Sequence, residues 1–224
     1  MGENSWGFMP GTGPSPEKEF DGLYGRYRIT VSDQLEVQRY RIALLLCGLS
    51  FTAGICQWLI LGPELAWLWL LPMATGLGLA LNWIHIYLRP LHLGLQMFWA
   101  FGCLGATFLL WKVGSSAMLT TLSSQPKWIW AIGPLFAALT GVGFKEFFCF
   151  RRPEAVGLTL MVPTALLGYL SGVLNGSIVM GLLVISAALL LIMALRKFGM
   201  EAAADVGDKS VFAYLDGQLP ADAL

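Results

Sequence analysis

Six mostly apolar stretches, each about 20 residues long, follow one another through the middle of this chain: Ile42–Leu61, Leu65–Leu88, Leu91–Trp111, Trp128–Phe150, Ala155–Leu174 and Ser177–Leu195. A bilayer has a hydrocarbon core about 30 Å thick, so a helix that rises 1.5 Å per residue needs roughly 20 apolar residues to cross it. Separate spans of this length must satisfy their backbone hydrogen bonds internally, which only helices can do. The sequence therefore predicts an all-α polytopic membrane bundle of six transmembrane helices.

The composition excludes several other classes of protein. Apolar residues make up 56% of the chain and charged residues 12%, with a mean hydropathy of +0.66. A soluble globule and a disordered chain both need far more polar surface than this. The net charge is zero, and the four cysteines form no disulfide framework. We therefore expect membrane lipids as partners and no nucleic acid.

The basic residues predict the orientation of the bundle. Eleven lie near span ends on one side of the predicted membrane and two, Lys112 and Lys127, on the other. The eleven are Arg26, Arg28, Arg39, Arg41, Arg89, Lys145, Arg151, Arg152, Arg196, Lys197 and Lys209. Because lysine and arginine accumulate on the cytoplasmic side, we expect both termini there, or on an equivalent side such as a stroma.

Two polar tails flank the membrane domain. The predicted organisation is a cytoplasmic arm over residues 1–41, a transmembrane domain over residues 42–195, and an acidic cytoplasmic tail over residues 196–224. The alternation from Arg26 to Val31 predicts a short strand or extended arm. Asp33 with Glu36 forms a capping-box pattern, which predicts the start of a helix leading into the first span.

The centres of the predicted spans lack ionisable residues. This pattern disfavours a proton- or sodium-coupled carrier, which needs a charged group near the midplane. The sequence has no His-Glu-x-x-His motif, which disfavours a zinc hydrolase. We therefore predict no catalytic residues, no metal site and no enzymatic activity.

Polar residues collect instead at the cytoplasmic ends of the second and third spans. Asn82, His85 and Arg89 are spaced for one face of the second helix, and His92 and Gln96 for one face of the third. His85 and His92 could ligate a haem, the magnesium of a chlorophyll or another metal. The favoured interpretation is that these groups hydrogen-bond to headgroups, water or carbonyls, so no cofactor is assigned.

A second polar group lies where the fourth span ends. It comprises Lys145, Glu146, Cys149, Arg151, Arg152 and Glu154. Two interpretations stay open: an ion-pair network that fixes topology, or a site where a protein partner or a lipid headgroup binds. Cys149 is the one cysteine near these bases, and therefore the candidate for reactivity or acylation.

Two stretches carry a resemblance to a known family. They are Tyr24–Thr30, followed by Asp33 and Tyr40-Arg41, and Phe144–Phe150, followed by Pro153–Ala155. They resemble an uncharacterised integral-membrane family of cyanobacteria and plastids, domain of unknown function 2301, over about Gly22 to Leu195. The resemblance implies a photosynthetic organism and a thylakoid or cyanobacterial inner membrane, but no reaction. It singles out Lys145, Glu146, Cys149 and Glu154.

Three functional hypotheses follow. The leading one is a non-enzymatic accessory or assembly factor that binds other membrane proteins, such as those of a photosynthetic complex. The second is a small channel or carrier for a neutral or lipid-like solute, suggested by faces of small residues and by Pro72, Pro134 and Pro163 within predicted spans. The third is a subunit that binds haem or chlorophyll through the histidines.

The predicted topology can be tested with accessibility tags. Tags at the two termini should both be shielded from a protease added to the outside of intact cells, because both ends are expected on the cytoplasmic side. A tag inserted between Lys112 and Lys127 should be cleaved in the same experiment. Cleavage at one terminus only would contradict an even number of crossings.

Overall fold

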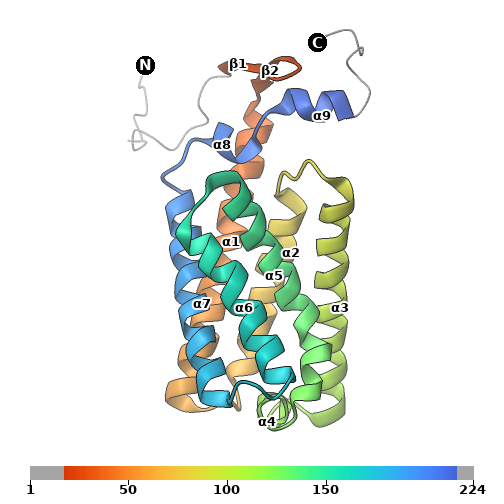
Figure 1. Cartoon of the computed structure of the whole chain (residues 1–224), viewed down its shortest axis with the longest axis vertical. Coiled ribbons are helices and arrows are strands. Elements are labelled where there is room, and N and C mark those ends of the chain that lie inside the picture. The colour runs from red at the N-terminus through yellow and green to blue at the C-terminus, as the bar shows by residue number, and fades with distance from the viewer. Residues whose placement is uncertain (1–17, 216–224) are drawn as a thin grey trace, which may run out of the picture. The chain divides into compact units, whose positions relative to one another are not determined.

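The computed structural model describes residues 18–215, so residues 1–17 and 216–224 of the predicted tails lie outside it. The described chain forms two compact units, drawn in Figure 1. The larger unit spans residues 39–200, and the smaller one combines residues 18–38 with residues 201–215.

The larger unit is a bundle of long helices joined by short connections. Its main helices are α1 (Val31–Leu61, whose first residues belong to the smaller unit), α2 (Leu70–Trp83), α3 (Arg89–Val113), α5 (Ile129–Phe150), α6 (Pro153–Leu170) and α7 (Gly176–Lys197). Short elements are the 3-10 turns η1 (Ala66–Trp69) and η2 (Pro126–Trp128) and the helix α4 (Met118–Ser124). In Figure 1, α5 and α6 lie in front, with α7 and α3 at the two edges.

Five segments among the described residues are helical, long and apolar enough to cross a bilayer. They are Val31–Leu61, Arg89–Val113, Pro126–Phe150, Pro153–Leu170 and Gly176–Lys197. This finding confirms the prediction of an all-α membrane bundle. It does not confirm the predicted count of six spans, because the second predicted span forms a shorter helix.

The second predicted span, Leu65–Leu88, was expected to be a single helix, but α2 has only 14 residues. The helix ends at Trp83, and Ile84 is already extended. Residues 84–88 are mostly apolar although they form the connection to α3, so hydropathy could not mark the helix end. The predicted shared helical face of Asn82, His85 and Arg89 is therefore wrong, since Arg89 begins α3.

Prolines have two different positions in the bundle. Pro134 and Pro163 lie inside α5 and α6, as predicted. Pro72 is the third residue of α2, in the first turn, where a helix has no intrahelical partner for the missing N–H. Pro72 therefore does not interrupt α2, although the sequence placed it inside a longer span.

The short helix α2 packs between α1 and α3. A Cβ atom at Gly76 would lie 2.7 Å from the backbone nitrogen of Cys47 on α1. On the other side, the Trp99 indole of α3 donates a hydrogen bond to the Ala74 carbonyl over 2.7 Å. Small residues on α2 thus allow the helices to approach closely. In lipid, where no hydrophobic effect drives helices together, this close van der Waals packing favours their association.

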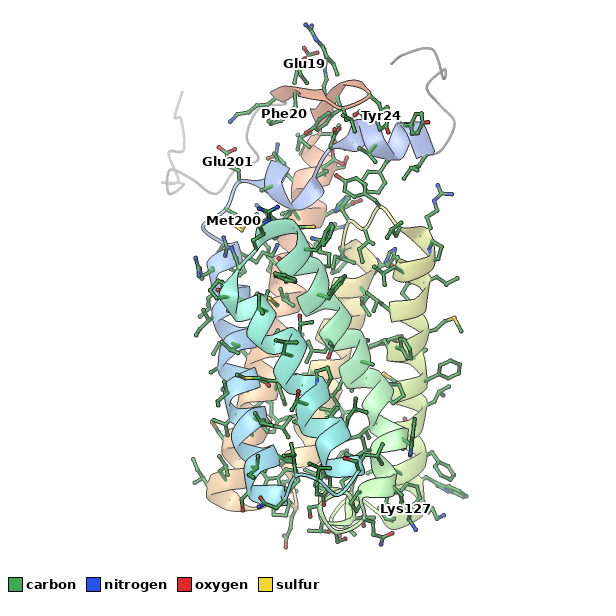
Figure 2. The ribbon with its side chains drawn as sticks, in the orientation of Figure 1. Glu19, Phe20, Tyr24, Lys127, Met200 and Glu201 are labelled. Atoms are coloured by element: carbon green, nitrogen blue, oxygen red, sulfur yellow. The ribbon has the colours of Figure 1, made fainter. Side chains whose placement is uncertain are left out.

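The first and last bundle helices meet at one end of the bundle. Arg41, on α1, donates a hydrogen bond to the carbonyl of Met200, just beyond α7, over 3.0 Å. Figure 2 shows Met200 and Lys127, which precedes α5, at opposite ends of the bundle. We call the Met200 end the basic end, because it carries Arg41, Lys145 and Lys197.

The smaller unit is built from segments far apart in sequence. Strands β1 (Lys18–Gly22) and β2 (Gly25–Ile29) pair antiparallel, and the short helices α8 (Ala202–Val206) and α9 (Lys209–Leu215) follow the bundle in the chain. Ile29, Val37 and Val206 form its small apolar core. The sequence predicted extended structure near β2 but missed β1, whose composition is polar.

The turn of the hairpin binds the C-terminal segment. The backbone N–H of Leu23 donates to Asp208 over 2.7 Å, and that of Tyr24 donates to the Ser210 hydroxyl over 3.0 Å. Burial alone would raise the pKa of Asp208, but hydrogen bonds from Ser210 and Leu23 hold this pKa below its ordinary value. Because its pKa is lowered on folding, Asp208 stabilises this unit above its unfolded-state pKa, and the stabilisation is lost as pH falls through the folded-state pKa.

A substitution at Gly22 tests the contact between the hairpin turn and the C-terminal segment. A Cβ atom at Gly22 would overlap Asp208 Oδ1 and Ser210 Oγ, so Gly22→Ala should separate the hairpin from the C-terminal segment. We expect faster hydrogen exchange at the Leu23 and Tyr24 amides, measured by mass spectrometry. Gly94→Ala is the matched control, since a Cβ atom there meets nothing within 4 Å. Unchanged exchange at Leu23 in Gly22→Ala would contradict the contact.

Candidate functional site

A buried carboxylate near the end of α5 joins three helices at the basic end. Glu146, 1% exposed, accepts hydrogen bonds at Oε1 from the Tyr40 hydroxyl of α1 over 2.7 Å and from Lys145 Nζ over 3.2 Å. Its Oε2 lies 2.6 Å from Nζ of Lys197, the last residue of α7. Both carboxylate oxygens are therefore paired with buried groups, and α1, α5 and α7 are tied together.

Aromatic rings complete the surroundings of the two lysines. Lys197 Nζ lies 4.2 Å from the ring centroid of Phe150 and 5.4 Å from that of Tyr40. Lys145 Nζ lies 5.5 Å from each of the two centroids. A ring face attracts a cation, most strongly where water is excluded. We call Tyr40, Lys145, Glu146, Phe150 and Lys197 the Glu146 cluster.

The residues of the cluster on α5 and α7 lie near the C-terminal ends of these helices. Helix α5 ends at Phe150, because Arg151 adopts a left-handed conformation with φ of 50° and Pro153 then begins α6. Lys197 lies in the last turn of α7, where a cation is also stabilised by the helix dipole.

A second buried carboxylate lies at the start of α6. Glu154, 4% exposed, pairs with Arg196 of α7 at 3.0 Å, and Arg152 lies 3.8 Å away. Its position in the first turn suits the positive end of the helix dipole. Glu154 therefore links α6 to α7, which is one of the three helices that Glu146 joins.

The six polar residues predicted as one site divide into two environments. Lys145, Glu146 and Glu154 are buried in ion pairs, as the network interpretation describes, whereas Cys149 and Arg151 are exposed and Arg152 is half-buried. Tyr40 and Lys197 also belong to the site, although their positions in the sequence did not predict it. Tyr40 belongs to the motif that carried the family resemblance, and this was the available signal.

The histidine region forms local contacts. His92 Nε2 lies 2.6 Å from the Leu81 carbonyl and 3.3 Å from Gln96 Nε2, while Asn82 is exposed. His85 is half-buried and also has an interaction partner. Among the described residues, no group of three or more His, Cys, Asp or Glu side chains is arranged to hold a metal ion. Ligation of haem or chlorophyll by His85 or His92 stays a prediction, which an absorption spectrum of the purified protein would test.

Away from the Glu146 cluster, the bundle contains an apolar cavity of about 160 Å³. Its walls come from α1, α2, α4, α5, α6, α7 and η1, and no charged side chain or histidine lines it. The cavity extends to Phe136 of α5 and Leu183 of α7. The lining residues are Ser50, Phe51, Gly54, Ile55, Trp58, Ala66, Trp69, Leu70, Met73, Leu119, Leu122, Ser123, Ile129, Ile132, Phe136, Leu166, Tyr169, Gly176, Val179, Met180 and Leu183.

Comparison with known proteins identifies relatives whose role is not described. A family model described as "Uncharacterized integral membrane protein (DUF2301)" matches residues 79–214. This match confirms the predicted family, over a range that begins later than the expected Gly22. The chain is 30% identical over 181 residues to an uncharacterized protein of Haemophilus influenzae, and the match covers 80% of this chain and 91% of that relative. No solved structure gives a significant match.

Removal of the Glu146 charge should destabilise the bundle. Glu146→Gln would leave two buried ammonium groups without their carboxylate, which should lower the free energy of unfolding by about 3–5 kcal/mol. Unfolding of the detergent-solubilised protein by a denaturing detergent measures the loss. Glu64→Gln, at an exposed position of the same unit, should change the free energy by less than about 0.5 kcal/mol. Equal stability of the two variants would refute the structural importance of the cluster.

Proposed function

The chain belongs to the family of uncharacterized integral membrane proteins called domain of unknown function 2301, and we propose that it is a non-enzymatic small carrier that binds a neutral, lipid-like molecule inside its helix bundle. The apolar cavity is the observation that carries this proposal. Ligand sites are concave and mostly apolar, with few polar groups. A wall without charged side chains suits a hydrocarbon chain and disfavours an ion or a charged metabolite.

The depth of the cavity supports a carrier. Leu183 lies within one helical turn of Ser186, near the middle of α7, and Phe136 lies within one turn of Leu139 on α5. The cavity thus reaches towards the level at which carriers bind their substrates. A surface groove for an annular lipid would not need this depth.

The Glu146 cluster has a defined place in this proposal. Helices α1, α5 and α7 line the cavity, and the same helices are tied together by Tyr40, Glu146 and Lys197. Release of a solute towards the basic end would require these contacts to separate. The cluster would then hold the bundle closed on that side between transport events.

We also propose that η1 and α2 together cross the membrane as a sixth span. The four residues of η1 rise about 2 Å each and the 14 residues of α2 about 1.5 Å each, which together approach the thickness of a bilayer core. The contact between Arg41 and Met200 supports an even number of crossings. Both termini would then lie on the cytoplasmic side.

A substitution at Gly176 tests the cavity. Gly176 is exposed and lines the cavity, so it lies at the opening, and a Cβ atom there meets nothing within 4 Å. Gly176→Leu should therefore fit sterically and obstruct the opening. With a photoactivatable long-chain fatty alcohol as the probe, labelling of cavity peptides should fall several-fold. Gly181→Leu is the matched control on the same helix, since Gly181 is equally free of neighbours but does not line the cavity. Equal labelling of both variants and the wild type would reject the proposal.

A second candidate function is an accessory or assembly factor for other membrane proteins. The observation that favours it is an exposed aromatic group near the basic end: Phe144, Phe147 and Phe148, with Phe148 74% exposed. Cys149 and Arg151 are exposed beside this group. Such a surface could bind a partner helix as well as lipid. Repeated affinity purification in mild detergent that recovers no membrane-protein partner would count against this role.

The accessory or assembly factor could act more specifically on a photosynthetic complex of a thylakoid membrane. Only the sequence resemblance suggests this specific role.

A further inference from the structure

Two lysines at the end of the bundle opposite the basic end lie near the same aromatic ring. Lys112, in the last turn of α3, has its Nζ 5.0 Å from the ring centroid of Trp128, and Lys127 has its Nζ 6.0 Å from the same centroid. Lys112 Nζ also lies 5.8 Å from the ring centroid of Phe108. The Trp128 indole is held in turn, because its Nε1 donates a hydrogen bond to Gln125 Oε1 over 3.2 Å. We call Phe108, Lys112, Lys127 and Trp128 the two-lysine patch.

The packing of α3 against α5 brings the two lysines together. A Cβ atom at Gly105 of α3 would overlap the carbonyl oxygen of Ala131 on α5, so the two helices are in close contact near this end of the bundle. Lys112 lies two turns beyond Gly105, and Lys127, in η2, lies one turn before Ala131. The helix packing therefore sets the separation of the backbone positions that carry the two lysines.

The two cations are not balanced by a carboxylate. Three connections lie at this end of the bundle: residues 62–69, 114–128 and 171–175. Their single acidic residue is Glu64, which is exposed, and neither lysine makes an ion pair within residues 18–215. The lysines of the Glu146 cluster, by contrast, are both paired with its carboxylate. An aromatic ring attracts a cation but does not cancel its charge, so the two-lysine patch keeps two positive charges.

Exposed tryptophans indicate the level of the patch in the membrane. Trp111, the residue before Lys112, is 81% exposed, and Trp130, at the start of α5, is 74% exposed. Tryptophan near the end of a membrane helix lies at the level of the lipid headgroups, with its ring in apolar surroundings and its N–H hydrated. Lys112 and Lys127 are exposed as well, and Figure 2 shows Lys127 at this end of the bundle. Their ammonium groups are therefore accessible at the level of the lipid phosphates.

We infer that the two-lysine patch binds the headgroup of an anionic phospholipid, whose phosphate is attracted by Lys112 and Lys127. A zwitterionic headgroup is a weaker partner, because its own ammonium group already compensates the phosphate. Phe108 and Trp111 are exposed beside the lysines and provide apolar contact for the first part of an acyl chain. Neither lysine lines the carrier cavity, so binding here does not require that the protein be a carrier.

Photolabelling with displacement tests this binding. The full chain in detergent is incubated with a phosphatidylglycerol that carries a diazirine in one acyl chain, near the glycerol backbone. After irradiation, mass spectrometry should find the label on peptides that contain residues 108–130. Unlabelled phosphatidylglycerol should displace this label at a concentration about five- to thirtyfold lower than phosphatidylcholine with the same acyl chains, since each lysine near a membrane surface strengthens the attraction of an anionic lipid about fivefold. The preference should shrink in 1 M salt, where charges are screened beyond about 3 Å.

Two double variants locate the preference. Lys112→Gln with Lys127→Gln removes both charges from exposed positions, so the two lipids should displace the label at nearly equal concentrations. Lys112→Arg with Lys127→Arg is the matched control, because it keeps both charges and should keep the preference for phosphatidylglycerol.

Three outcomes would overturn the inference. One is equal displacement by the two lipids in the wild type, which decides the question even if a variant fails to fold. Another is a preference that persists after both lysines are replaced by glutamine. The third is displacement of the label by inorganic phosphate as effective as that by phosphatidylglycerol, because the patch would then bind a soluble anion and not a lipid.

Discussion

Hydrocarbon offers no hydrogen bonds, so each polar group within this bundle must find its partner in the protein or at the membrane edge. The Glu146 cluster is the clearest consequence. Glu146 is buried with Lys145, Lys197 and the Tyr40 hydroxyl around it, so both of its oxygens are paired. Burial of an unpaired charge is strongly unfavourable. Loss of any one charged partner would therefore leave an uncompensated charge inside the bundle and destabilise it. The cluster consequently joins α1, α5 and α7 at the basic end.

The opposite part of the bundle follows the same constraint in a different way. There the interior is apolar, and it contains a cavity lined by no charged side chain instead of a network of ion pairs. One end of the molecule is thus closed by directional polar contacts and the other is built from non-directional packing, which adapts more readily to a ligand. This division underlies the proposed carrier function, in which the same helices bind the solute and close the bundle.

Particular elements show how far sequence reasoning extends. Hydropathy located α3, α5, α6 and α7 well, because their apolar runs end close to where the helices end. It failed at α2, because the connection after Trp83 is as apolar as the helix itself. The close contact of α3 with α5 was also not predicted: a Cβ atom at Gly102 or Gly105 would overlap the α5 backbone at Leu135 or Ala131. Glycines mark a close approach, but their partners depend on which helices become neighbours.

The sequence by itself determined that this chain is a membrane protein with helical spans, with its basic residues gathered on one side and with Lys145, Glu146 and Glu154 as notable groups. These properties depend on composition and on local spacing, which need no knowledge of the fold. Only the tertiary structure decided that Tyr40 and Lys197 complete the Glu146 cluster, that an apolar cavity lies between several helices, and that Lys112 and Lys127 lie near one aromatic ring. Each of these results depends on distances between different segments of the chain, and the packing of the helices sets those distances.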